Sequence, residues 1–237
     1  YQRNENGGWK YVRINYQNNT FDNLNKNIIL LQSMFAVTFT ANRDSRWLFE
    51  ILQFLFRHIE ELNNQEFGDY FKEFLEKMAV RYAEERLFTE DKSIKKYGAI
   101  PVYAFNFVDY VLWKNREELK KDYDIEFGDF KFAYRRSIEH WYPQNPNGHD
   151  GESQLSSEFL HSFGNLCIIT DSQNSRFGNS YPEAKLEQWE REGIFHRQSL
   201  KLQMMAKVTS KKNRWDIGEI QSMEKEVERY VQNFCNS

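Results

Sequence analysis

The spacing of apolar residues changes once along this chain, and that change limits the folds it can adopt. From Leu24 to about residue 121, apolar residues recur every three or four positions, as they do on one face of a helix. At residues 130–140, and again at residues 166–170, the pattern becomes short and typical of strands. We therefore expect a mainly helical protein with one small pair of strands set between helical regions.

The helical pattern divides into several segments with recognisable starts. Ser45 and Pro182 stand where helix caps and first turns favour those residue types. Residues 36–40, AVTFT, look extended instead. The terminal segment is amphipathic, with Ile217, Ile220, Met223 and Val227 on one side, and could hold the strand region against the helices. The expected helices cover residues 24–35, 47–59, 66–88, 103–121, 182–192 and 214–234.

Phe130, Phe132 and Tyr134 alternate with other residues in the segment that leads to the dipeptide Glu139-His140. This alternation predicts a strand with His140 at its end. Residues 166–170, LCIIT, would be its antiparallel partner, and residues 182–192 would supply the helix of a ββα unit. The strands would then bring sequence-distant polar groups to one place.

Three polar residues around these strands have the chemistry that phosphodiester hydrolysis needs. His140 suits a general base because the ordinary pKa of histidine is near neutrality. Glu139 and Asn174 offer a carboxylate and an amide oxygen, which suit Mg²⁺ or Mn²⁺. Zinc is disfavoured because Cys167 and Cys235 form no paired CxxC spacing.

These residues resemble the HNH, or ββα-metal, endonucleases. The chain is most similar to the C-terminal nuclease domain of GmrSD-type, modification-dependent restriction proteins, over about residues 130–190. The resemblance rests on an acidic-His pair followed by PQ, on a GNL element and on a later NS…N segment. The matching residues are Glu139, His140, Pro143, Gln144, Gly164, Asn165, Leu166, Asn174, Ser175 and Asn179.

The resemblance implies a role for each of the four central residues. Glu139 and Asn174 would bind a single Mg²⁺ or Mn²⁺, and His140 would be the general base. Asn165 would hold the loop and orient the histidine. The family often has histidine as its last motif letter, whereas this chain has Asn174.

Other residues near the motif are candidates for contact with substrate. Arg176, Asn179, Lys185 and His161 could bind it, although a charged residue on a helix or loop is usually only solvated. His161 could instead pack against or orient the catalytic loop, and His149 is expected to be exposed. Each motif residue also has an ordinary structural reading, Asn165 as a turn residue among them.

The chain has 237 residues and a net charge of −3, which argues against a strongly basic coat for DNA but allows a local positive cleft. We expect a helical domain at residues 1–128 and the nuclease domain with its C-terminal helix at 129–237, with a soft boundary. The first residue is Tyr1, which suggests the C-terminal part of a longer protein. The resemblance implies a missing N-terminal sensor or nucleotide-hydrolysing domain, since no GxxxxGK[ST] motif is present.

No apolar run is long enough to span a bilayer, and two unpaired cysteines fit a reducing cytoplasm. The leading hypothesis is a metal-dependent DNA endonuclease acting in defence against modified or foreign DNA. A noncatalytic DNA-binding or assembly module that keeps the HNH fold is the alternative from another class. A nuclease acting on RNA is a third possibility.

Overall fold

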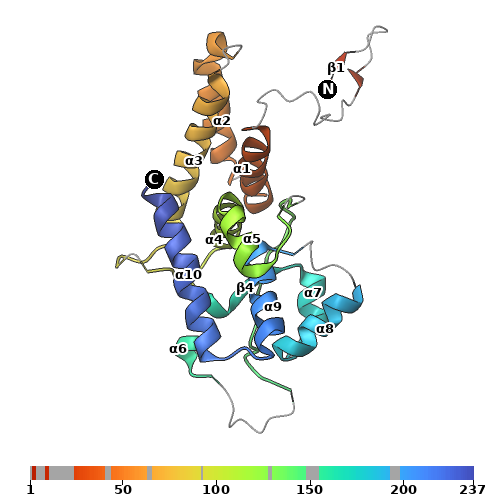
Figure 1. Ribbon diagram of the computed structural model, residues 1–237. Coiled ribbons are helices and arrows are strands. Elements are labelled where there is room, and N and C mark those ends of the chain that lie inside the picture. Colours follow the sequence, from red (N-terminus) through yellow and green to blue (C-terminus); the bar gives the residue numbers. More distant parts are fainter. Residues whose placement is uncertain are drawn as a thin grey trace.

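The structure is a computed structural model, mainly helical, with two short pairs of strands in the described chain (Figure 1). It describes residues 2–3, 9–10, 24–40, 44–62, 66–91, 93–127, 130–147, 155–192 and 198–237. Two short strands, β1 (Gln2–Arg3) and β2 (Trp9–Lys10), pair near the N-terminus. None of the helices in the described ranges has the length and apolar character needed to cross a membrane.

The helices follow one another along most of the described chain. The longer ones are α1 (Asn25–Thr38), α2 (Arg46–Arg57), α3 (Phe67–Arg86), α4 (Val102–Lys114), α5 (Arg116–Tyr123), α8 (Pro182–Glu192), α9 (Leu200–Lys212) and α10 (Ile217–Cys235). The shorter ones are η3 (Ile59–Glu61), α6 (Ser157–Leu160), η4 (Phe163–Asn165) and α7 (Asp171–Phe177).

Helix α4 is the centre of the core. Its sequence, VYAFNFVDYVLWK, is apolar around nearly the whole helix, and its residues from Tyr103 to Trp113 are all buried. It packs against α1 and α3, which precede it in the sequence, and against α9 and α10, which follow it. The contacts of α4 therefore cross residue 128, and the domain boundary there stays a prediction.

The structure differs from the sequence expectation in several helical segments. Residues 36–38 continue α1 rather than forming an extended stretch, and the single helix expected at 103–121 is two helices that meet at Asn115. Helix α9 was not expected at all. In its sequence, LKLQMMAKVTSKK, the polar residues Lys201 and Gln203 are buried together with the apolar ones. Polar and apolar residues therefore do not separate into two helix faces in the sequence.

The strand pair is present but short. Strand β3 (Ser137–His140) runs antiparallel to β4 (Leu166–Ile169), with Glu139 opposite Cys167 and His140 opposite Leu166. The alternating residues 130–134 lie outside β3, so the expectation of a long strand was wrong there. Since β4 has only four residues, it offers no partner to residues before Ser137.

The segment after β4 is helix α7, which is not among the expected helices. Thr170 caps it, because the Thr170 hydroxyl accepts a hydrogen bond from Gln173 N–H and the Gln173 side chain accepts one from Thr170 N–H. Two helices, α7 and α8, thus follow the strand pair, and Asn174 lies within α7.

Helix α10 holds the strand region, as expected. It packs against η4 and against α4, and it buries Ile220, Met223 and Val227, although Ile217 is exposed. Gly164 in η4 allows this approach, because a Cβ atom there would overlap the backbone carbonyl of Ile220. The glycine of the GNL element is therefore required by the packing of η4 on α10.

Candidate active site

Residues from β3 and from α7 with the turn after it line one cleft of about 280 Å³. Glu139 and His140 come from the end of β3, and Asn174 comes from α7. The full lining is Glu139, His140, Pro143, Gln144, Asn145, Asn174, Gly178 and Asn179. The structure therefore brings together the acidic-His pair, the PQ element and the NS…N segment.

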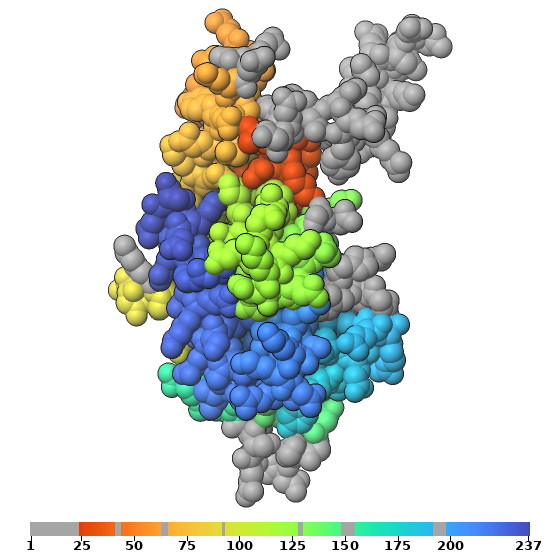
Figure 2. Space-filling view, in the orientation of Figure 1, coloured from red at the N-terminus to blue at the C-terminus, as the bar shows by residue number. Residues whose placement is uncertain are grey.

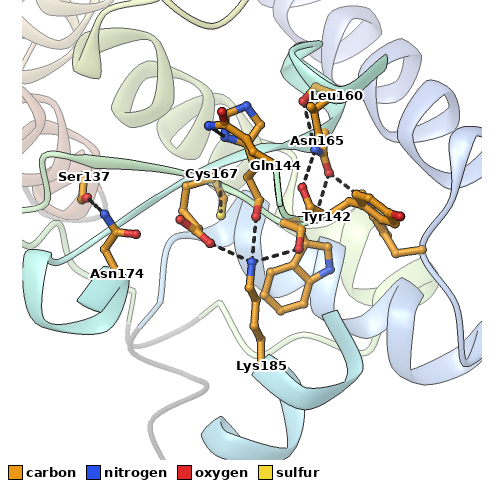
Figure 3. Close-up of polar contacts among 12 residues, drawn as sticks. Ser137, Tyr142, Gln144, Leu160, Asn165, Cys167, Asn174 and Lys185 are labelled. Atoms are coloured by element: carbon orange, nitrogen blue, oxygen red, sulfur yellow. Dashed lines mark hydrogen bonds and ion pairs between the residues drawn. The ribbon is translucent and has the colours of Figure 1, made fainter. Parts of the chain in front are cut away.

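Asn165 anchors the loop that follows His140 (Figure 3). It is fully buried, and its side-chain oxygen accepts hydrogen bonds from Tyr142 N–H at 2.8 Å and from the Trp215 indole at 3.1 Å. Its amide nitrogen donates to the carbonyls of Tyr142 at 3.1 Å and Leu160 at 3.0 Å. Every hydrogen-bonding position of the amide is thus used to fix the loop.

Lys185 binds Glu139 beneath the cleft. The Lys185 side chain is fully buried on α8, and its Nζ atom donates to Glu139 Oε1 at 2.7 Å. It also donates to the backbone carbonyls of His140 at 2.7 Å and Trp141 at 3.0 Å. These three acceptors match the three donors of an ammonium group. This placement argues against the phosphate contact that we expected for Lys185.

Burial and the contact with Lys185 have opposing effects on the pKa of the Glu139 carboxyl group. Burial raises the pKa of Glu139, while the charge and hydrogen bond of Lys185 lower it. Only Oε1 is used by Lys185 in this arrangement, so Glu139 can present its second oxygen to the cleft that it lines.

His140 is buried between two polar partners. Its Nε2 atom lies 3.0 Å from His161 Nδ1, and its Nδ1 atom lies 2.9 Å from Gln144 Nε2. The Tyr97 ring also lies against it, with 4.5 Å between ring centroids. Burial, followed by the nearby His161 and Lys185, lowers the pKa of His140 to about 4. The imidazole is therefore neutral at neutral pH.

The hydrogen bonds assign the tautomer of His140. The Gln144 amide nitrogen is a donor, so Nδ1 of His140 accepts and Nε2 carries the proton that is donated to His161. His161 thus contacts His140 directly, and its role as an orienting residue stays a prediction. The lone pair on His140 Nδ1, which could act as a base, faces the side chain of Gln144, and Gln144 lines the cleft.

The remaining candidates lie around α7. Asn174 donates from Nδ2 to Ser137 Oγ at 2.7 Å, which joins α7 to β3 (Figure 3). Asn179 is exposed and lines the cleft. Arg176 and Ser175 are exposed on α7, outside the lining of the cleft. His149 lies outside the described residues.

Two residues near the site carried no signal in the sequence. Lys201 is fully buried, and its Nζ atom donates to the carbonyls of Phe163 and Leu166, which flank Asn165. Tyr97 packs its ring on both His140 and His161 and donates from its backbone to the His161 carbonyl at 3.0 Å. Lysine in a core and a lone tyrosine in a loop are not distinguishable by pattern.

The donors fit a hard cation better than zinc. Among the described residues, no three His, Cys, Asp or Glu side chains gather into a metal site. The cleft instead offers one carboxylate and the amide groups of Gln144, Asn145, Asn174 and Asn179. Mg²⁺ is commonly bound by one or two carboxylates and keeps several waters, so a sparse oxygen set of this kind suits it.

A larger hollow, of about 810 Å³, lies among α5, α9 and α10. Its lysines are partly neutralised, because Lys207 lies 3.5 Å from Asp124 and Lys212 lies 2.8 Å from Glu219. It contains none of the motif residues. The smaller cleft is therefore the better candidate site.

The fold and the cleft define a class: a mainly helical protein in which a two-stranded antiparallel sheet presents a Glu-His pair to a polar cleft. Residues 88–227 match the family described as GmrSD restriction endonucleases, C-terminal domain, and the chain therefore belongs to that family. Membership indicates a nuclease role in restriction. No curated protein and no solved structure matches the chain significantly.

Proposed function

We propose that this chain is an HNH-type endonuclease that hydrolyses DNA phosphodiester bonds with the help of one divalent cation. The observation that carries the proposal is the convergence of Glu139, His140 and Asn174 on one cleft, beside a loop that Asn165 anchors. Restriction of modified or foreign DNA in the cytoplasm is the biological role that we propose from the family.

Glu139 and Asn174 would hold the cation, Mg²⁺ or Mn²⁺. Asn174 uses its amide nitrogen for Ser137, so its oxygen is the atom suited to a metal. A bound divalent cation supplies neutralisation of charge on the phosphate and on the departing oxygen. The free oxygen of Glu139 is the second protein ligand in this proposal.

His140 would take a proton from the attacking water through Nδ1. That step requires Gln144 to turn away, because its amide nitrogen lies 2.9 Å from Nδ1. When Nδ1 is protonated, His161 Nδ1 can still accept the Nε2 proton, so the ring keeps its orientation. The lowered pKa keeps His140 neutral beforehand.

Asn165 and Lys185 would act as positioning residues. Asn165 fixes the Tyr142 backbone, and Lys185 binds the carbonyls of His140 and Trp141 together with the Glu139 carboxylate. Both side chains therefore set where the Glu-His pair points. Small errors in such placement reduce rates strongly.

The substrate is proposed to be DNA, with Arg176 and Asn179 as candidate contacts at the edge of α7. A partner domain that senses modified DNA or hydrolyses nucleotide is proposed from the resemblance. RNA stays an alternative substrate, and the 2′-hydroxyl is the group by which a protein can tell RNA from DNA.

Plasmid cleavage with Mg²⁺, Mn²⁺ or EDTA tests the proposal directly. We expect nicked or linear product with either cation and none with EDTA. Asn174→Ala should need a higher cation concentration for the same rate, whereas Arg191→Ala, on exposed α8 surface, should not. Metal-independent cleavage, or an unchanged cation titration for Asn174→Ala together with Glu139→Gln, would refute this metal assignment.

The noncatalytic DNA-binding module is the second candidate. It is favoured by one observation: Glu139 is already paired with Lys185, and both ring nitrogens of His140 have partners. DNA binding without cleavage under any cation would support this reading over the enzyme.

A further inference from the structure

Helix α2 and the short 3-10 helix η3 that follows it present an apolar face to solvent. Phe56 is 77% exposed, Phe49 64%, Ile59 58% and Leu52 56%. Leu48 and Leu62 extend the same region and are 42% and 41% exposed. Soluble monomers rarely leave so many large apolar side chains uncovered in one place, and such patches commonly mark interaction sites. We call these six residues the α2 patch.

The α2 patch is separate from the face that α2 uses in the core. Ile51 and Phe54 are the buried residues of α2, and the Phe54 ring stacks on Phe74 of α3 with 4.1 Å between centroids. The apolar character of the other face is thus not explained by folding of the described chain. In Figure 2 the orange surface of α2 and α3 forms one end of the molecule.

The spacing within the α2 patch is that of a helix-pairing seam. Phe49, Leu52 and Phe56 of α2, and Ile59 at the start of η3, follow one another at intervals of three, four and three residues. Apolar residues at this spacing line the contact between two packed helices in a coiled coil. The occupant of the patch should therefore present a helix of similar apolar character.

Side chains of opposite charge are available at the two ends of the α2 patch. Arg46 is exposed at the N-terminal end, where it pairs with Glu50 of the same helix, and Glu60 and Glu61 are exposed at the C-terminal end. A second α2 lying antiparallel across the patch would place Arg46 opposite Glu60 of the partner subunit. The same arrangement places Phe49 opposite Phe56 of the partner subunit, so the patch complements itself, as a two-fold interface requires.

The available area is consistent with a dimer. The exposed parts of the six side chains amount to roughly 600 Å² per protomer, against ~800 Å² per partner in a standard interface. The polar residues at the rim would supply the remainder. We propose that the α2 patch is a homodimer interface in which two α2 helices pack antiparallel about a two-fold axis near Leu52.

The dimer would leave the candidate active site open. Figure 1 shows α2 and α3 at one end of the molecule and α7 and α8 at the other. Substitutions in the α2 patch can therefore be made without touching Glu139, His140 or Asn174. This inference is independent of the proposed nuclease activity.

Light scattering coupled to size-exclusion chromatography tests the proposal. Over a wide range of concentration, the chain of 28.7 kDa should approach twice that mass. Phe56→Glu should be monomeric, and Tyr134→Glu, at an exposed aromatic outside the patch, should remain dimeric. Circular dichroism should show that both variants are folded, since both side chains are more than half exposed.

A charge exchange tests the antiparallel arrangement. Arg46→Glu and Glu60→Arg should each weaken the dimer, and the double variant should recover it. A wild-type chain that stays monomeric at every concentration would overturn the proposal. So would a dimer that survives Phe56→Glu, or a double charge variant that is no tighter than either single one.

Discussion

The Lys185 ammonium lies 2.7 Å from Glu139 Oε1 and is fully buried. It thus compensates the charge of a carboxylate that would otherwise be costly to keep near the core. Because the same ammonium binds the carbonyls of His140 and Trp141, the pair joins α8 to the end of β3. The charge of Glu139 and the position of His140 are therefore linked through one side chain.

Removing Lys185 should destabilise the fold. Lys185→Met leaves Glu139 without its buried partner, which typically lowers the free energy of unfolding by about 3–5 kcal/mol. The double variant Lys185→Met with Glu139→Gln should recover part of that loss, because no unpaired charge remains. Urea denaturation measures both.

The matched control is Lys77→Met. Lys77 pairs with Glu73 on the surface of α3, with both side chains more than half exposed. Exposed pairs of this kind contribute little to stability. An equal effect of the two lysine substitutions would contradict a structural role for the buried pair.

His140→Ala should reduce cleavage by roughly a hundredfold to ten-thousandfold, the usual effect of losing a general base. DNA affinity, measured by gel shift, should change little. His58→Ala is the matched control, since His58 is half-buried at the end of α2, remote from the cleft. Wild-type turnover by His140→Ala would remove the histidine from the mechanism.

Asn165→Ala should lose both stability and activity. The substitution leaves the buried groups of Tyr142 and Leu160 without partners, at about 1–3 kcal/mol for each unsatisfied group. Metal affinity should persist, because Asn165 is not a proposed ligand. Melting temperature, metal affinity and cleavage should be measured on one preparation. A destabilised variant that still cleaves at the wild-type rate would leave Asn165 a purely structural residue.

The activity should be insensitive to mild acid. The pKa of His140 is lowered to about 4, so its base form persists as pH falls from neutral and is lost only near pH 4. We expect kcat at saturating cation to stay flat through the ordinary pKa of histidine and to decline well below it. Half-maximal activity near pH 6.5, with the fold intact by circular dichroism, would show an unperturbed base.

Asp109→Asn should change how stability depends on pH. Burial raises the pKa of Asp109 from 3.8 to about 7, so the folded state holds this proton more tightly than the unfolded state. That stabilisation is complete below about pH 4 and is lost as pH rises through about 7. The amide side chain of the variant would have no such proton to lose. It would still offer an oxygen to Lys201 N–H, as the Asp109 carboxyl does at 3.0 Å.

The measurement is the free energy of unfolding of both proteins at a series of pH values. Between about pH 4 and 7 the wild-type chain should lose stability relative to Asp109→Asn. Parallel curves for the two proteins would contradict a raised pKa at this position.

The sequence by itself determined the helical character of the chain, the approximate strand pair and six of the eight residues that line the cleft. Amphipathic repeats and caps act locally, so α3, α8 and α10 lie close to their expected ranges. The motif also identified Glu139, His140, Asn174 and Asn179, which meet in one cleft. The glycine of the GNL element has a structural reason, because a Cβ atom at Gly164 would overlap the Ile220 carbonyl of α10.

Only the tertiary structure decided how those residues are held. Lys185 looked like a phosphate-binding residue in sequence, but the buried acceptors at Glu139, His140 and Trp141 turn it inward. Lys201 also points inward, because its ammonium donates to the carbonyls of Phe163 and Leu166, which are distant from it in the sequence. The extent of β3 likewise depends on its partner, since residues 130–134 alternate without a strand to pair with. These features arise from contacts between distant segments, which the spacing of residues along one segment does not encode.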